Sequence, residues 1–235
     1  MKIFHTTLKV FTILLLGIVF FGVEPIVCAA ESTNPDKTNV HFQWTFGAIR
    51  KMDQDSKFET IVDDTVLKTG DQIKFFIKVK NSSFIYLIYH SSQGELSVLF
   101  PYRFKPLSKE FRALEHHYVP KGDQWFKLDD HVGQETFYLL ASSRRLYDLE
   151  KLINNYESAD KIKKSGHTKK ILAEIDKLRK PHVKLKTSAE RPVAIIGNLR
   201  TAGKSEFVKG RELANYAVEI SAQDFYSRVF TIDHK

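Results

Sequence analysis

The stretch Val40-His41-Phe42-Gln43-Trp44-Thr45-Phe46 places a large apolar side chain at every second position. Successive side chains of a β-strand point to opposite faces, so this period predicts a strand with one buried face. Residues 73–79 (IKFFIKV) repeat the pattern, with Lys74 and Lys78 expected to face outward. Half-buried strands of this kind need a second layer to cover their apolar face.

Residues 84–89 (FIYLIY) are apolar on both faces, which predicts a strand that is covered on both sides. A turn at Gly94 leads from this strand into residues 95–100 and predicts a hairpin. Short strands separated by frequent turns favour a mainly β fold, an antiparallel β-sandwich of the immunoglobulin-like kind. Further strands are expected at residues 124–128, 135–141, 191–197, 215–220 and 225–232.

A helical period replaces the strand period after residue 144. One apolar stripe runs from Leu146 to Tyr156, and a second runs from Ile171 to Leu178 and stops before Pro181. Ser142 or Ser143 is the expected N-cap, and Ser165-Gly166 is the expected break between the two helices. We therefore expect an α-hairpin at about residues 144–181, inserted in or appended to one sandwich domain that spans residues 40–235.

The N-terminus has the pattern of a secretory signal peptide. Lys2 and Lys9 precede the uncharged residues 10–23, and Cys28-Ala29-Ala30 ends the segment. Fourteen residues in a helix reach about 21 Å, which is short of the roughly 30 Å hydrocarbon core of a bilayer. The sequence predicts a signal peptide over residues 1–30 that is cleaved near Ala30, then a flexible leader over residues 31–39, and a secreted, periplasmic protein.

Cys28 is the only cysteine in the chain, and cleavage after Ala29 or Ala30 would remove it. The alternative is a lipoprotein whose first residue is a lipidated Cys28. Pro25 and Val27 stand where such signals favour an aliphatic and a small residue, so simple secretion is favoured. The exported chain would contain no thiol, and its core alone would have to stabilise the fold.

Several landmarks lie between residues 60 and 150: a Thr69-Gly70-Asp71 turn, the apolar strand at 84–88, Gly94, Leu99-Phe100-Pro101, Tyr118-Val119-Pro120, Gly133-Gln134-Glu135 and Ala141-Ser142-Ser143. As a set they resemble a bacterial family catalogued as domain of unknown function 4384. The resemblance implies an all-β accessory domain, found alone in exported proteins or attached to catalytic modules, and it brings no known catalytic residues. Residues 150–235 extend beyond the usual pattern.

The formal charge of the chain is +8, and it is concentrated in the predicted hairpin. Between Glu150 and Arg191 there are twelve Lys/Arg against six Asp/Glu. An exported protein meets little nucleic acid, so we expect an anionic envelope component, including the membrane surface, or an acidic protein partner, although such runs are often only solvated helix faces. The candidate binding residues are Lys161, Lys163, Lys164, Lys169, Lys170, Lys177, Arg179 and Lys180.

No catalytic, metal or cofactor motif is complete. Gly197 and Gly203 are separated by five residues, where a phosphate-binding loop needs four. His116-His117 would point to opposite faces of a strand, and Asp129-Asp130 lacks the rest of a calcium loop. We therefore expect a non-enzymatic accessory or binding module without a cofactor. The alternative is an envelope hydrolase whose dispersed site lies in the sandwich loops, because such sites are recognised only by geometry.

Overall fold

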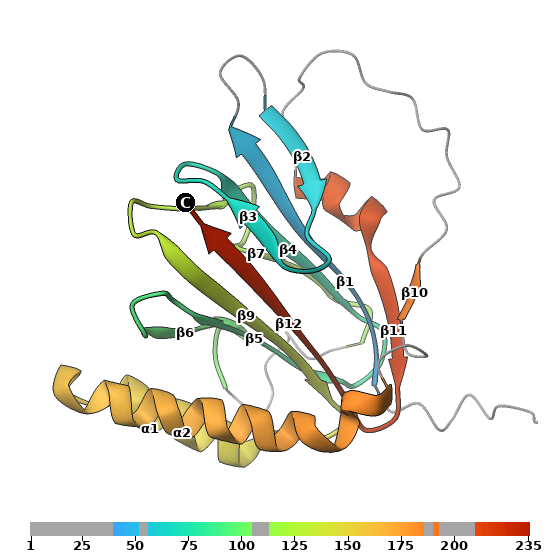
Figure 1. The fold of residues 1–235 in the computed structure, drawn as a ribbon. Helices are drawn as coiled ribbons and strands as arrows, with labels where there is room; N and C mark the ends of the chain where they lie inside the picture. The colour runs from blue at the N-terminus through green and yellow to red at the C-terminus, as the bar shows by residue number, and fades with distance from the viewer. Residues whose placement is uncertain (1–39, 52–55, 105–112, 186–189, 193–209) are drawn as a thin grey trace, which may run out of the picture. The chain divides into compact units, whose positions relative to one another are not determined.

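Strand β1 (Val40–Lys51) is the centre of the first sheet, because it pairs along its length with neighbours on both sides. The computed structural model describes residues 40–51, 56–104, 113–185, 190–192 and 210–235, which all lie in one compact unit (Figure 1). The alternating apolar side chains of β1 are buried as predicted, from Val40 to Phe46.

Sheet A has the order β10 (Glu190–Pro192), β11 (Val218–Ala222), β1, β4 (Gln72–Val79) and β7 (His116–Val119). Beside this path, β2 (Ser56–Thr60) pairs with β1, and β8 (Phe126–Lys127) pairs with β4.

Sheet B has the order β3 (Thr65–Leu67), β12 (Phe225–His234), β9 (Gly133–Ser142), β5 (Phe84–His90) and β6 (Leu96–Phe100). All its strand pairs are antiparallel except β12 with β3. The two sheets confirm the predicted sandwich.

Phenylalanine rings fill the space between the sheets. Phe46 stacks on Phe75 within sheet A, with 3.8 Å between the ring centroids. Phe137 and Phe230 of sheet B meet the ring of Phe46 at 5.2 and 5.3 Å. Aromatic pairs at these separations contribute beyond the area they bury, so the many phenylalanines of the chain are used to join its two layers.

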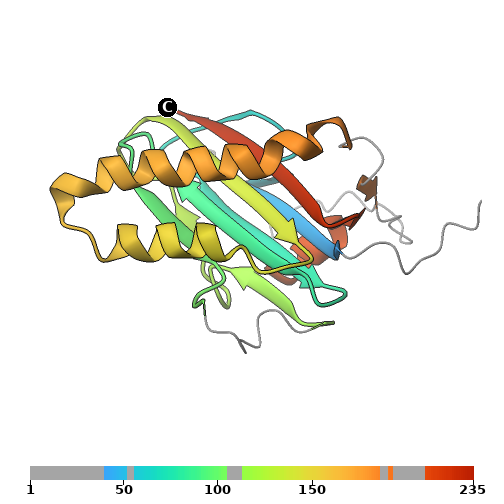
Figure 2. The same cartoon turned by 90° about the horizontal axis from the view of Figure 1, so that it is seen from below.

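The helices α1 (Tyr147–Glu157) and α2 (Lys161–Arg179) form the predicted hairpin and cover the outer face of sheet B (Figure 2). Tyr86 and Ile88 of β5 pack against this hairpin, in a cluster with Ile153 and Ile171. The other face of β5 contributes Ile85 and Leu87 to the core between the sheets. The prediction that β5 is covered on both faces is therefore confirmed.

Three local predictions for the helices and the C-terminal strands were wrong. α2 runs without interruption through Ser165-Gly166, and the break between the helices lies at residues 158–160. The N-cap of α1 is Leu146, without a side-chain hydrogen bond. Gly210–Tyr216 forms the 3-10 helix η4, so the strand expected from residue 215 begins at Val218.

Lys74 lies on the outer face of sheet A, yet it is fully buried. Its ammonium donates hydrogen bonds to the carbonyl oxygens of Gly122 and Gln124, each at 2.5 Å, and it lies near the rings of Tyr118 and Trp125. The two carbonyls replace the water that burial removes. Burial lowers the pKa of Lys74.

Several predicted features lie outside the described residues. They are the signal peptide, the leader, Cys28, residues 193–197 of one predicted strand and the loop from Gly197 to Ser205. Within the part of the chain that the structure describes, no helix combines the length and the apolar character that a membrane crossing requires.

Candidate functional site

One face of α2 is fixed against sheet B, and this determines which side chains face outward. Thr168, Ile171 and Ile175 are buried beneath the helix at spacings of three and four residues. These spacings mark one side of a helix with 3.6 residues per turn. The opposite side of α2 is therefore presented to solvent.

The structure divides the eight predicted binding residues into two groups. Lys164 is half-buried and lies 4.8 Å from the ring of Tyr156, and Arg179 is half-buried and pairs with Asp176 at 3.3 Å. These two side chains are part of the hairpin's own packing. The other six are exposed, and we call them the lysine face: Lys161, Lys163, Lys169, Lys170, Lys177 and Lys180.

Three members of the lysine face stand in one row along α2. Lys163, Lys170 and Lys177 are spaced by seven residues, so each step advances about 10.5 Å and turns the side chain by only about 20°. Lys163 and Lys177 have carboxylate partners, the exposed Asp160 at 3.7 Å and the half-buried Glu174 at 3.0 Å. Both ammonium groups are themselves exposed, and ion pairs of exposed lysines contribute little to stability.

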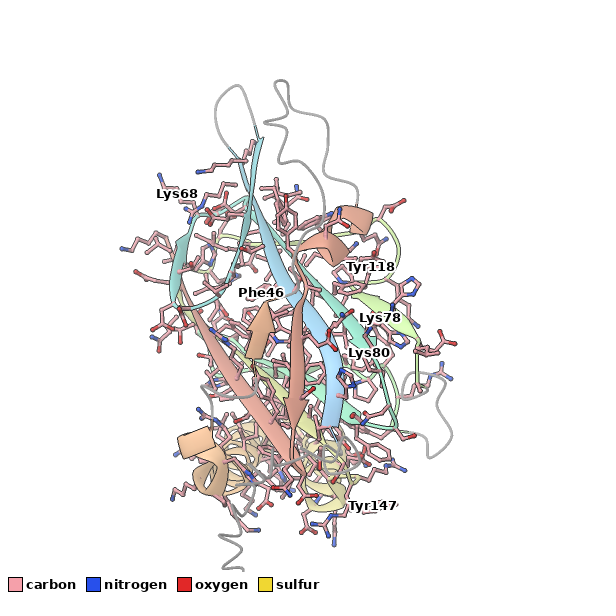
Figure 3. The ribbon with its side chains drawn as sticks, turned by 90° about the vertical axis from the view of Figure 1, so that its right-hand side faces the viewer. Phe46, Lys68, Lys78, Lys80, Tyr118 and Tyr147 are labelled. Carbon is pink, nitrogen blue, oxygen red and sulfur yellow. The ribbon has the colours of Figure 1, made fainter. Side chains whose placement is uncertain are left out.

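The remaining members, Lys161, Lys169, Lys170 and Lys180, have no ion pair within the described residues. Two lysines outside the hairpin, Lys78 and Lys80, lie on the sheet A side of the molecule (Figure 3). There Lys80 helps to lower the pKa of Glu219, after hydrogen bonds from His41 and Gln43, so its charge has a neighbouring carboxylate.

A buried network fixes the start of the hairpin to sheet B. The carboxylate of Glu150 accepts hydrogen bonds from Tyr86 Oη at 2.7 Å and from Arg145 Nη2 at 2.7 Å. Burial raises the pKa of Tyr86, and the hydrogen bond to Glu150 raises the pKa of Arg145. Arg145 also donates to the carbonyl oxygen of Phe104. The lysine face is therefore carried by a helix pair with a polar anchor as well as apolar packing.

A cleft of about 660 Å³ lies where the ends of the sheet B strands meet the ends of the two helices. This volume is in the range of small-molecule sites. Ser143 Oγ lies 3.3 Å from Asp224 Oδ1, and the ring of His182 lies 5.0 Å from that of Phe225. The cleft is lined by Phe84, Ser142, Ser143, Arg144, Arg145, Leu146, Tyr147, Leu178, His182, Asp224 and Phe225.

This strand-end cleft was not predicted from the sequence. Its lining comes from four separate parts of the chain, and no spacing signal connects them. Of the residues that the sequence analysis singled out as family landmarks, Ser142 and Ser143 line the cleft. The lining combines apolar side chains with polar and charged ones, among them Ser143, His182 and Asp224. In the described residues the serine is bonded to the aspartate rather than to the histidine.

Two other family landmarks have structural roles. The carboxylate of Asp71 is buried and accepts hydrogen bonds from the backbone amides of Lys51 at 2.9 Å and Lys68 at 2.8 Å. The buried carboxylate of Glu135 accepts from Tyr89 Oη at 2.5 Å and Ser92 Oγ at 3.0 Å. Both carboxylates stabilise turns, and this structural role is enough to explain why Asp71 and Glu135 belong to the family landmarks.

The described residues contain no group of three His, Cys, Asp or Glu side chains placed to hold a metal ion. His116 and His117 lie against different rings, Phe76 at 6.4 Å and Phe100 at 5.1 Å. Phe76 belongs to the outer cluster of sheet A and Phe100 to the core, so the adjacent histidines occupy opposite faces of β7, as predicted.

Comparison with known proteins gives one finding. A search of curated proteins and a search of solved structures found no match. A family model does match: it is described as Domain of unknown function (DUF4384), and it covers residues 66–145 of the 235. The covered part runs from β3 to Arg145, so it includes one wall of the cleft and ends before the lysine face. The resemblance drawn from the turn, strand and Leu-Phe-Pro landmarks is thereby confirmed, and residues 66–145 are the part of this chain that is similar to the family.

Proposed function

We propose that this protein is an exported, non-enzymatic binding module of the bacterial cell envelope, and that it engages an anionic partner through the lysine face. One observation carries the proposal: five lysines of α2, and Lys180 directly after it, are exposed, while the buried side of α2 packs on sheet B. Because the helix is already fixed on the sheet, its backbone does not have to be ordered when the lysines bind a partner.

The binding test compares two variants of equal charge. The first changes Lys163, Lys169, Lys170 and Lys177 to Glu and spares Lys164, because Lys164 packs on Tyr156. The control changes four exposed lysines away from the hairpin, Lys51, Lys57, Lys68 and Lys127. Both lower the formal charge by the same amount, so non-specific attraction falls equally in the two.

The measurement is the salt concentration that elutes each variant from a sulfated polysaccharide resin. Each basic residue near an anionic surface is worth about 1 kcal/mol, so the lysine-face variant should lose retention while the control keeps most of it. Equal loss in both variants would mean that only net charge matters, and the proposed site would be rejected.

Export is supported by the cationic start, the apolar residues 10–23 and the small residues before Glu31. N-terminal sequencing of the protein recovered outside the cytoplasm should give Ala30 or Glu31 as the first residue. A chain that begins at an acylated Cys28 would show a lipoprotein instead, and an unprocessed chain would contradict export.

The second candidate function is hydrolysis in the strand-end cleft, which brings Ser143, Asp224 and His182 to one place. A nucleophile of this type needs a base within hydrogen-bond reach, and such contacts often tighten only when substrate binds. The test is hydrolysis of a panel of chromogenic esters and phosphate esters by the protein and by the Ser143→Ala and His182→Ala variants. Turnover abolished by both substitutions would establish the enzyme and displace the binding proposal for this cleft.

A further inference from the structure

Ile162 is the most exposed large apolar side chain of the described residues, at 94% of its full area. It stands in the first turn of α2, between Lys161 and Lys163 of the lysine face. Transfer of an isoleucine side chain from water to an apolar environment is favourable by about 1.5–3 kcal/mol, so Ile162 would strengthen binding to a surface that has an apolar layer below its charges.

Ile162 does not stand alone on the outward side of α2. Gly166 and Ala173 are exposed and follow at four and eleven residues, on the same side of the helix. The lysine row of Lys163, Lys170 and Lys177 borders this strip. The outward side of α2 therefore offers one large apolar side chain, Ile162, beside a row of cations. Attraction of cations to anionic headgroups and burial of an apolar side chain below them are the two contacts that hold a helix at a membrane interface.

A protein partner would call for different side chains. Binding hot spots are formed by Trp, Tyr and Arg that insert into well-packed pockets. The exposed residues of α2 include no aromatic side chain and no arginine; besides the lysines they are one isoleucine, three small residues and Asp176, which pairs with Arg179. A fluid layer of anionic headgroups needs no pocket, and lysine stems can extend along it with their ammonium groups in water.

The placement of the helix fits such a surface. α2 has 19 residues, about 28 Å, and Figure 2 shows it beside α1, across the outer face of sheet B. The exposed side of α1 bears Asp148, Lys151 and Glu157, so the net positive charge of the hairpin is concentrated on α2.

We propose that the anionic partner is a lipid bilayer, on which α2 lies flat with its lysines at the headgroups and Ile162 inserted below them. This inference rests on the proposed function and names its target. It assigns to Ile162 an interfacial role that an acidic protein or a soluble polysaccharide would not require.

The experiment measures partitioning onto vesicles of phosphatidylglycerol and phosphatidylcholine, and onto phosphatidylcholine alone, by co-sedimentation. All variants begin at Glu31, as the proposed exported chain does, so the apolar residues 10–23 do not contribute to partitioning. Ile162→Ser should weaken partitioning onto the anionic vesicles about tenfold, and Ile162→Trp should keep or strengthen it, because tryptophan favours the interface. The control Val132→Ser removes another exposed apolar side chain, at 60% exposure, and should change nothing.

A second measurement on the sulfated polysaccharide resin separates the two proposals. If Ile162→Ser binds vesicles and resin as the unsubstituted protein does, while the lysine-face variant loses both, then the bilayer inference is overturned and the anionic binding function stands. If the lysine-face variant keeps both kinds of binding, the proposed function itself fails. Loss of vesicle binding alone in Ile162→Ser, with resin retention unchanged, supports the bilayer.

Discussion

The carboxylate of Glu150 joins three elements of the fold, because it bonds Tyr86 of β5 and Arg145 before α1 while standing in α1 itself. The side chains of Arg145 and Glu150 are only 10% and 6% exposed. Glu150→Ala leaves the guanidinium buried without its counter-charge, and removing one member of a buried pair costs about 3–5 kcal/mol. We expect a loss of this size in the free energy of unfolding, measured by urea denaturation.

The matched control for Glu150 lies in the same helix. Glu157 is exposed near the end of α1, and Glu157→Ala should change the free energy of unfolding by less than about 0.5 kcal/mol. A similar small effect for Glu150→Ala would show that the network contributes nothing.

Glu219 provides a pH-dependent contribution on the sheet A side. Its pKa lies below the ordinary 4.5, first because of the hydrogen bond from His41 at 2.5 Å and then because of that from Gln43. A folded pKa below the unfolded value means that the stabilisation is complete above about 4.5 and is lost as the pH falls through the folded value. Glu219→Gln should therefore be less stable than the unsubstituted protein at pH 7, and the difference should shrink on acidification to about pH 3. Urea unfolding at both pH values measures it, and a pH-independent difference would contradict the assignment.

At the scale of the element, Gly166 separates two interpretations of the hairpin. In the structure it lies inside α2, exposed, with nothing within 4 Å of an added Cβ. Gly166→Ala should then stabilise the protein by about 0.5–1 kcal/mol, because alanine is the better helix former. If Gly166 ended a helix in a left-handed conformation, as the sequence suggested, the same substitution would destabilise. Thermal unfolding decides the sign.

Strands were predictable where their own residues determine burial. The alternation of apolar residues in β1 predicted the two layers. The apolar character of both faces of β5 predicted that sheet B is covered on its outer face. The helix break was mispredicted because one exposed glycine costs only about 1 kcal/mol, whereas Ile171 and Ile175 are fully buried against the sheet. Packing therefore outweighed the local signal.

The two candidate sites, the lysine face and the strand-end cleft, also differ in how far the sequence could predict them. The lysine face could be predicted, since its members are neighbours on one helix. What the sequence did not show is that Lys164 and Arg179 turn back into the hairpin, because this depends on Tyr156 and on the direction of the buried face. The strand-end cleft could not be predicted at all, because sheet topology alone brings Phe84, Arg144 and Phe225 together.

In the whole molecule, both sheets combine strands of residues 66–145 with strands from outside this segment. Within sheet A, β4 of this segment pairs with β1, which precedes the segment. Within sheet B, β9 pairs with β12, which begins eighty residues after the end of the segment. β12 also lies between β9 and β3. The segment alone would expose the apolar faces of β4 and β9 and leave β3 without a neighbour, and unpaired strands with open apolar faces do not fold stably.

We therefore expect a fragment of residues 66–145 to be unfolded, and a fragment of residues 35–235 to unfold cooperatively. Far-UV circular dichroism and amide hydrogen exchange on the two fragments test this, with the longer fragment as the control for expression and handling. Protected amides in residues 84–90 of the short fragment would show that the segment folds by itself, and that β1, β12 and the hairpin are additions to a complete domain. Absence of protection there, with protection in the longer fragment, would mean that the family pattern marks one contiguous part of a fold that is completed by strands from both sides of it.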